Sequence, residues 1–104
     1  MRKVRFSRSA KDDLHAIGVY TIQRWGLTQA SRYLAELHET ANRIATHANM
    51  GHACDWIRPG LRRFEKGSHI LFYRRLEDGI FILRILHKSM LPELHSFADL
   101  ASSD

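Results

Sequence analysis

Four side chains in the middle of this 104-residue sequence carry groups that could together cleave a phosphodiester. His69 and Tyr73 offer a general base and a general acid, while Arg62 and Arg84 offer guanidinium groups that bind phosphate. The strand pairing predicted below places all four on one face of a sheet. The simpler interpretation is structural, because Tyr73 and Arg84 then oppose each other and the guanidinium can stack on the ring. We therefore expect no catalytic residue in this set.

A second group of chemically capable residues lies in a segment rich in turn formers. His47, His52 and Cys54 carry nitrogen and sulfur donors of the kind that bind zinc. No second cysteine accompanies Cys54, and an exposed loop is a poor cage for a metal. We expect neither a metal site nor a cofactor.

The residues that would position His69, Tyr73 and the arginines belong to a predicted three-strand antiparallel meander within 61–92. Two short apolar runs, Ile70–Tyr73 and Ile80–Leu86, are bounded by turn residues at Gly67-Ser68 and at Asp78-Gly79. If both turns have two residues, cross-strand partners follow by counting. The predicted pairs are Lys66 with His69, Phe64 with Leu71, Arg62 with Tyr73, Tyr73 with Arg84, Leu71 with Leu86, and Arg75 with Ile82.

This register predicts two different faces. One is mixed, and we expect it to be free for a partner. It carries Arg62, Phe64, Lys66, His69, Leu71, Tyr73, Arg75, Ile82, Arg84 and Leu86. The other is more apolar, and we expect it to meet the helices. It carries Ile70, Phe72, Phe81, Leu83, Ile85 and His87, with Arg63 and Arg74 toward its edges.

Two helices are predicted ahead of the meander. Ser9 is a suitable N-cap for a helix that begins at about Ala10 and ends at Gly26. Thr28 is a suitable N-cap for a second helix, and the short Gly26-Leu27 connection requires a hairpin. The second helix has one apolar stripe, formed by Ala30, Tyr33, Leu34, Leu37, Ala41, Ile44, Ala45 and Ala48.

The remaining segments complete an α+β domain that spans residues 1–104. Val4–Ser7 is predicted to be extended, 47–60 is predicted to be a loop anchored by Trp56, and a short helix is predicted from Pro92 to Leu100. Residues 101–104 are expected to be frayed. The expected architecture is an N-terminal strand and a helical hairpin packed on an antiparallel sheet.

Composition restricts the classes of function. The chain has 16 Lys and Arg against 11 Asp and Glu, a net charge of +5, and residues 58–88 alone account for an excess of +5. Such a balance favours an anionic or acidic partner. No apolar run approaches the roughly 20 residues that cross a bilayer, no signal peptide is evident, and a single cysteine fits a reducing compartment. We expect a cytoplasmic protein that has no membrane partner.

Several short motifs, in this order and at this spacing, resemble a known family. They are FS-x-S-A-x-x-D-L from Phe6, RWG at Arg24–Gly26, RPGLR at Arg58–Arg62, HILFYR at His69–Arg74, ILRILH at Ile82–His87 and MLPE at Met90–Glu93. The chain resembles the ParE branch of the RelE/ParE toxin superfamily, over about Val4 to His95. That family has a helical hairpin over an antiparallel sheet, which agrees with the periodicity.

The resemblance implies a toxin of a type II toxin–antitoxin system that inhibits DNA gyrase by stabilising its cleaved DNA complex. It implies a small, DNA-binding, ParD-like antitoxin that neutralises the toxin in a hetero-oligomer. Members of this branch are inhibitors and not enzymes. Lys88, Ser89 and Leu91 depart from the usual ParE pattern of Gly-Arg and Asp after the last strand, which places the potency against gyrase in doubt.

The alternative is a RelE-like, ribosome-dependent mRNA endoribonuclease. RelE-like nucleases carry two arginines and a tyrosine at positions that match Ile70, Ser89 and His95 here, so the residues that cut RNA are absent. A third possibility is a basic module that merely associates with DNA. We predict that a protein partner, above all the antitoxin, covers the mixed surface formed by Arg62, Phe64, Lys66, His69, Leu71, Tyr73, Arg75, Arg84, Leu86 and Lys88.

Overall fold

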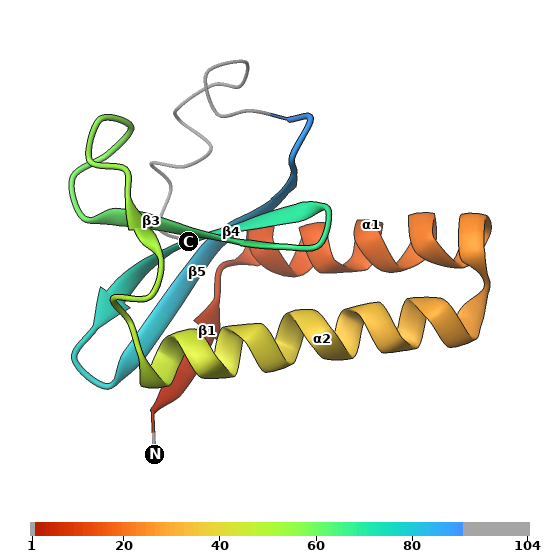
Figure 1. Ribbon diagram of the computed structural model, residues 1–104, viewed down its shortest axis with the longest axis horizontal. Helices are drawn as coiled ribbons and strands as arrows, with labels where there is room; N and C mark the ends of the chain where they lie inside the picture. The colour runs from red at the N-terminus through yellow and green to blue at the C-terminus, as the bar shows by residue number, and fades with distance from the viewer. Residues whose placement is uncertain (1, 91–104) are drawn as a thin grey trace.

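Two helices pack on one face of a five-stranded sheet in the computed structural model, which describes residues 2–90 (Figure 1). The order of strands across the sheet is β1-β5-β4-β3-β2. The predicted α+β class and helical hairpin are confirmed. The predicted C-terminal helix and the predicted frayed end, 101–104, lie outside the described residues. The elements are β1 (Lys3–Phe6), α1 (Arg8–Trp25), α2 (Leu27–Thr46), β2 (His52–Ala53), β3 (Leu61–Lys66), β4 (His69–Leu76) and β5 (Gly79–His87).

The first helix begins two residues earlier than its sequence pattern predicts. The N-cap is Ser7, whose hydroxyl accepts a hydrogen bond from the amide of Ala10 at 2.9 Å and donates one to the carbonyl of Leu83 at 2.7 Å. Ser9 was the wrong serine because only Ser7 directly follows β1, where the chain leaves the sheet. The cap therefore also joins the helix to the far half of β5.

The hairpin turn depends on one glycine. Gly26 has φ +90°, a conformation that residues with a side chain rarely adopt, and it ends α1 and precedes α2 directly. The predicted Thr28 cap is wrong, because α2 already begins at Leu27 and no side chain caps it. The predicted apolar stripe of α2 is confirmed, since Leu37, Ala41 and Ile44 are almost fully buried.

The sheet is mixed. The predicted meander of β3, β4 and β5 is antiparallel, whereas β1 pairs with β5 in parallel. β2, a two-residue strand that pairs with β3, lies within the predicted loop 47–60. Trp56 does not anchor that loop, because its side chain is 65% exposed; Cys54 and Ile57 pack against the sheet in its place.

The predicted register is right across the first turn and wrong across the second. Lys66 pairs with His69, Phe64 with Leu71, and Arg62 with Tyr73, as counting predicts. The second turn, however, is formed by Glu77 and Asp78, because Gly79 is already the first residue of β5.

Moving the second turn back by one residue shifts the partners of residues 73–76 by two positions. Tyr73 pairs with Ile82 in place of Arg84, and Arg75 pairs with Ile80 in place of Ile82. A bulge then leaves Leu83 without a partner, so that Leu71 pairs with Ile85 in place of Leu86. The bulge moves Ile85 to the helix side and Leu86 to the opposite side.

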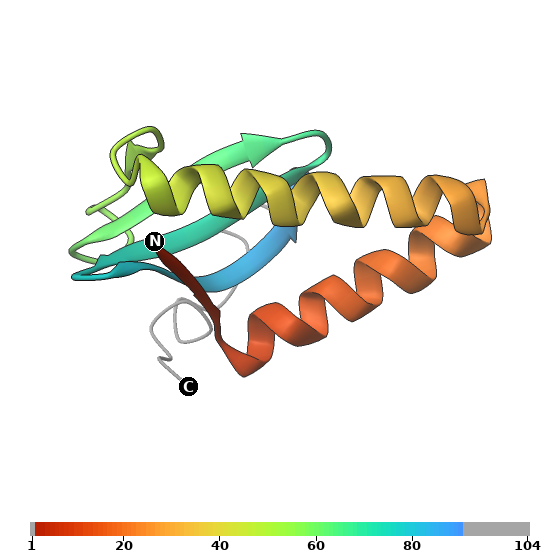
Figure 2. The ribbon, with the colours of Figure 1, turned by 90° about the horizontal axis from the view of Figure 1, so that it is seen from below.

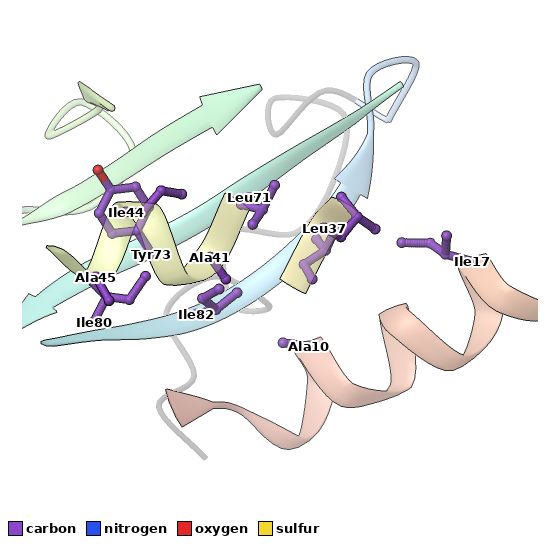
Figure 3. Close-up of a cluster of buried hydrophobic side chains, with 11 residues drawn as sticks. Ala10, Ile17, Leu37, Ala41, Ile44, Ala45, Leu71, Tyr73, Ile80 and Ile82 are labelled. Atoms are coloured by element: carbon purple, nitrogen blue, oxygen red, sulfur yellow. The ribbon is translucent and has the colours of Figure 1, made fainter. Parts of the chain in front are cut away.

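The prediction of which face meets the helices is also wrong. Leu71, Tyr73 and Ile82 pack against α1 and α2 in the principal core, together with Ile17, Leu37, Ala41 and Ile44 (Figure 3). The opposite face holds a second buried cluster, formed by Ile70, Phe72, Leu83 and Leu86 with Cys54, Leu61 and the partly buried Ile57 and Phe81. Since both faces are apolar and buried near the middle of the sheet, apolar content could not tell them apart. Neither helix is long and apolar enough to cross a membrane.

Candidate functional site

A groove lies between α1 and the C-terminal half of β5. It consists of two neighbouring cavities of about 380 Å³ and 300 Å³ that share Tyr20, His69 and His87. We call it the α1 groove. The larger cavity is lined by Asp13, Ala16, Ile17, Tyr20, His69, Ile85, Leu86, His87, Ser89 and Met90, and the smaller one adds Thr21, Arg24, Trp25, Gln29, Tyr33 and Ser68.

The apolar wall of the groove comes from α1. The hairpin extends beyond the sheet, so the end of α1 next to the hairpin turn has no sheet to pack on (Figure 2). Tyr20 is 54% exposed and Trp25 is 67% exposed, and the guanidinium of Arg24 lies 5.6 Å from the centroid of the Tyr20 ring. Val19 and Ile22 on the same helix are also exposed. Large exposed apolar side chains that gather on one element are typical of an interaction surface.

An ion pair fixes α1 over β5. The carboxylate of Asp13 accepts hydrogen bonds from Nε and Nη2 of Arg84, at 2.8 and 3.0 Å, and from the amide of Ile85, at 2.9 Å. The two side chains are only 13% and 17% exposed. Because Asp13 also satisfies a backbone amide of β5 beyond the end of β1, it completes the edge of the sheet and fixes the width of the groove.

His69 and Tyr33 form a polar part of the groove, and both side chains are uncharged at neutral pH. Nδ1 of His69 lies 2.6 Å from the hydroxyl of Tyr33, which also accepts a hydrogen bond from the amide of Ser68 at 3.1 Å. Burial, and secondly the neighbouring His87, lower the pKa of His69 to about 4. Burial has the opposite effect on the pKa of the Tyr33 hydroxyl, which it raises, because burial disfavours the charged form of either group. At neutral pH both groups are therefore uncharged.

His87 pairs with His69 across β4 and β5, and the two rings pack edge to face with their centroids 5.3 Å apart. Nδ1 of His87 lies 2.8 Å from the hydroxyl of Ser89 and accepts a hydrogen bond from the amide of Ser89 at 3.1 Å. These contacts serve to hold the turn after β5.

The chemistry of the groove favours binding over catalysis. A histidine with a pKa of about 4 is a weak base at neutral pH, and Asp13 and Arg84 are engaged with each other. Within residues 2–90, no three His, Cys, Asp or Glu side chains come together as metal ligands. What remains is a largely apolar trough with exposed aromatic rings, which is suited to a partner's apolar side chains.

The residues predicted from the sequence to bind a partner do not form one free surface. Tyr73, Leu71 and Leu86 are buried, so the prediction that they are exposed is wrong. The hydroxyl of Tyr73 donates to the carbonyl of Ala48 at 2.8 Å and accepts from the amide of Gly51 at 3.2 Å.

The predicted polar residues mostly have partners within the chain. Arg62 donates to the carbonyls of Asn49 and Gly51, and Arg75 donates to the side chain of Asn49. Lys88 pairs with Glu65 at 3.1 Å. Phe64 is partly buried against the principal core, and Lys66 is half-buried. Of the predicted set, His69 and Leu86 line the α1 groove. A role for any of these residues in partner binding stays a prediction.

The groove residues of α1 are not among those predicted from the sequence to bind a partner, although a signal was present. Val19, Ile22 and Trp25 extend the apolar positions of α1 beyond one stripe, and such a wide apolar face is more than a single sheet contact needs. Asp13 gave no such signal, because its partner Arg84 lies 71 residues away.

Known proteins resemble this chain over most of its length. The family described as ParE toxin of type II toxin–antitoxin system, parDE, matches residues 4–92. The chain is 45% identical to Toxin ParE1 of Caulobacter vibrioides over 95 residues, which cover 91% of this chain and 98% of that protein. It is also 45% identical to Toxin ParE1 of Mycobacterium tuberculosis over 85 residues, which cover 81% of this chain and 87% of that protein. A solved structure of the chromosomal ParDE toxin–antitoxin system from P. aeruginosa is similar, with a TM-score of 0.70, 26% identity, and coverage of 84% of this chain and 96% of that one.

Proposed function

Since this chain belongs to the ParE toxin family of type II toxin–antitoxin systems, we propose that it inhibits DNA gyrase by stabilising the cleaved DNA complex, and that a ParD-like antitoxin neutralises it. Gyrase and the antitoxin act in the cytoplasm, and we propose that this chain acts there too. The toxin and its antitoxin would form a hetero-oligomer. The observation that carries the proposal is the α1 groove, an open and largely apolar surface with exposed aromatic rings.

The antitoxin is the partner that the groove suits best. The exposed rings of Tyr20 and Trp25 and the buried Ile17 offer places for apolar side chains, and Arg24 adds a positive charge at the rim. An amphipathic helix or extended segment that carries apolar and acidic residues would match this pattern. The cavity volumes, about 380 and 300 Å³, leave room for several such side chains.

Substitution in the groove tests the antitoxin part of the proposal. Tyr20→Ala should weaken the affinity for the antitoxin encoded beside this gene at least tenfold, because truncating an aromatic anchor commonly costs about 1.4 kcal/mol or more. Val19→Ala is the matched control, since Val19 is exposed on the same helix turn but does not line the groove. Isothermal titration calorimetry gives both affinities. Equal affinities for the two variants would place the antitoxin elsewhere.

A cleavage assay tests the gyrase part. Purified gyrase, supercoiled plasmid and ATP are incubated with the toxin, and the complexes are trapped with detergent and protease. Linear plasmid should accumulate as the toxin concentration rises, and an equimolar amount of antitoxin should abolish it. A lack of linear DNA at a large excess of toxin would rule out gyrase poisoning.

The alternative of a RelE-like nuclease finds little support in the side chains. The position that matches one RNA-cutting arginine holds Ile70, which is buried in the second cluster, and the other holds Ser89, which hydrogen bonds to His87. Neither carries the positive charge with which an arginine stabilises a developing phosphate charge. Toeprinting on a translated message distinguishes the two functions, because a nuclease of this kind cuts within codons and only when ribosomes are present.

A further inference from the structure

The smaller cavity of the α1 groove differs in chemistry from the larger one. The larger cavity has aliphatic side chains in its lining, namely Ala16, Ile17, Ile85, Leu86 and Met90, and none of them lines the smaller cavity. Each described residue that lines the smaller cavity carries a nitrogen or an oxygen in its side chain. We call this cavity, of about 300 Å³, the polar cavity.

One charged side chain lines the polar cavity. Arg24 is the only Lys, Arg, Asp or Glu among the described lining residues, and its guanidinium stays protonated at physiological pH. The guanidinium lies 5.6 Å from the centroid of the Tyr20 ring, close enough for a cation–π contact that restricts its position. The wall of the cavity therefore holds a positive charge that no lining carboxylate of the described chain offsets.

His87 adds a hydrogen-bond donor to the same wall. Its Nδ1 accepts a hydrogen bond from the amide of Ser89 at 3.1 Å, so this nitrogen presents a lone pair. The ring proton must then be on Nε2. Within residues 2–90, no acceptor hydrogen bonds to this Nε2–H group.

His69 presents its ring in the same way. The hydroxyl of Tyr33 lies 2.6 Å from Nδ1 of His69 and 3.3 Å from the carbonyl of Lys66. A hydroxyl donor makes bonds of about 2.7 Å, whereas a ring N–H donor makes bonds of about 2.9 Å, so the short contact fits donation by Tyr33 to Nδ1. Because the ring is neutral, with a pKa of about 4, its one proton is on Nε2.

The three donors come from three separate elements and are held by their neighbours. Arg24 lies in the last turn of α1, His69 begins β4 and His87 ends β5. Tyr33 fixes the ring of His69, Ser89 fixes the ring of His87, and the two rings pack against each other. Since the fold already orders these side chains, an acceptor that enters the cavity meets them at a small entropic cost.

We propose that Arg24, His69 and His87 form an anion-binding subsite that receives the carboxylate of one Asp or Glu side chain of the antitoxin. The guanidinium and the two Nε2–H groups donate hydrogen bonds to this carboxylate, and such charge-assisted bonds are the strong ones. The inference rests on the antitoxin part of the proposed function and extends it, because it assigns to the polar cavity the recognition of one acidic side chain.

A protein segment suits this arrangement better than a nucleic-acid strand does. The larger cavity beside the subsite is lined by aliphatic side chains, so it has a place for an apolar side chain and none for a phosphate. A segment with an apolar residue near an acidic one fills both cavities, whereas a strand would bring a second phosphate against the aliphatic lining.

The first test concerns the donors and needs no partner. Long-range ¹H–¹⁵N correlation NMR of the full-length toxin at neutral pH reports which ring nitrogen of each histidine carries the proton, and single-histidine substitutions assign the signals. The Nε2–H form is expected for both His69 and His87. A proton on Nδ1 of either uncharged ring would overturn the proposed donor set.

The second test measures affinity by isothermal titration calorimetry. Arg24→Gln should weaken the affinity for the antitoxin encoded beside this gene about tenfold, because a hydrogen bond to a charged group commonly contributes that much. Lys11→Gln is the matched control and should leave the affinity unchanged, since Lys11 is an exposed cation of the same helix that lines neither cavity. Circular dichroism checks that both variants keep the fold.

A charge exchange identifies the acidic residue. Arg24→Glu should weaken binding more than Arg24→Gln does, because it places two carboxylates together. Each Asp and Glu of the antitoxin is then changed to Arg in turn, and one of these changes should restore at least a tenfold part of the affinity for the Arg24→Glu toxin. The same change should weaken binding to the parent toxin.

The outcomes separate the subsite from the function on which it rests. A parent toxin with no measurable affinity for the antitoxin would refute the antitoxin part of the proposed function, and the subsite with it. If the parent toxin binds and Arg24→Gln binds equally well, or if no acidic residue of the antitoxin restores binding, only the subsite is refuted. Binding of an oligo(U) probe that depends on Arg24, with an antitoxin affinity that does not, would assign the cavity to nucleic acid instead.

Discussion

The ion pair between Asp13 and Arg84 offers the sharpest test of how the groove is built. Asp13→Ala removes three hydrogen bonds to β5, of 2.8, 3.0 and 2.9 Å, from side chains that are 13% and 17% exposed. Breaking a fully buried pair costs about 3–5 kcal/mol, because the partner is left buried and charged. Partial exposure lets water reach Arg84, so we expect a loss of about 2–4 kcal/mol in the free energy of unfolding.

Urea denaturation followed by circular dichroism measures this loss. With a slope of about 1–3 kcal/mol per molar urea, the midpoint should fall by roughly 1–2 M. Asp12→Ala is the matched control, because Asp12 is the preceding residue of the same helix and is exposed. The control should stay within about 0.5 kcal/mol of the parent chain.

A double-mutant cycle with Arg84→Met separates the pair from other effects of each substitution. If the two side chains stabilise the fold through each other, the coupling energy should be about 2 kcal/mol. A coupling energy below about 0.5 kcal/mol would refute the reasoning, since the bond lengths would then carry no energetic weight. A large loss for Asp13→Ala with little coupling would instead assign the effect to the amide of Ile85.

Three further predictions concern stability. The pKa of His69 is lowered from 6.5 to about 4, so the unfolded chain takes up the proton first, and the stability that neutral His69 contributes is complete above pH 6.5 and is lost as the pH falls toward 4. After discounting for solvent screening of this half-exposed ring, the loss in the free energy of unfolding should be about 1–2 kcal/mol. A His69→Gln variant should show a flatter curve of urea midpoint against pH over that range. Tyr73→Phe should lower the free energy of unfolding by about 1–2 kcal/mol, because it removes a buried hydroxyl that accepts from Gly51, and an unchanged thermal midpoint would contradict the assigned hydrogen bonds. Gly79→Ala should expose the amides of β1 to hydrogen exchange, because a Cβ there would clash with the carbonyl of Lys3 and the backbone has φ +155°. Gly60→Ala is the control: its φ is also positive, +83°, but a Cβ there would meet open space, so the amides of β1 should stay protected.

Local sequence signals predicted the elements and failed at two caps. The apolar stripe of α2, the hairpin at Gly26 and the meander follow from periodicity and turn residues, which act over a few neighbouring positions. Ser7 and Ser9 are both good N-caps by type. Only the bond from Ser7 to the carbonyl of Leu83, 76 residues away, selects the first.

The pairing of β4 with β5 could not be read from the turn residues alone. Asp78-Gly79 is a common hairpin turn, yet Gly79 lies inside β5, where the carbonyl of Lys3 in β1 approaches so closely that a Cβ has no space. The glycine is required by the neighbouring strand and not by the turn. The bulge at Leu83 similarly has no local signal in the sequence.

The sequence by itself determined the α+β class, the order of the elements other than β2, and the family, because these depend on local patterns and on motifs spread along most of the chain. Tertiary structure decided which face of the sheet meets the helices, since both faces are apolar and a shift of one residue exchanges them. It also decided that Tyr73 is a core residue, that Asp13 meets Arg84, and that Tyr20 and Trp25 stand free beside a groove. Each of these depends on contacts between residues far apart in the chain, which periodicity does not encode.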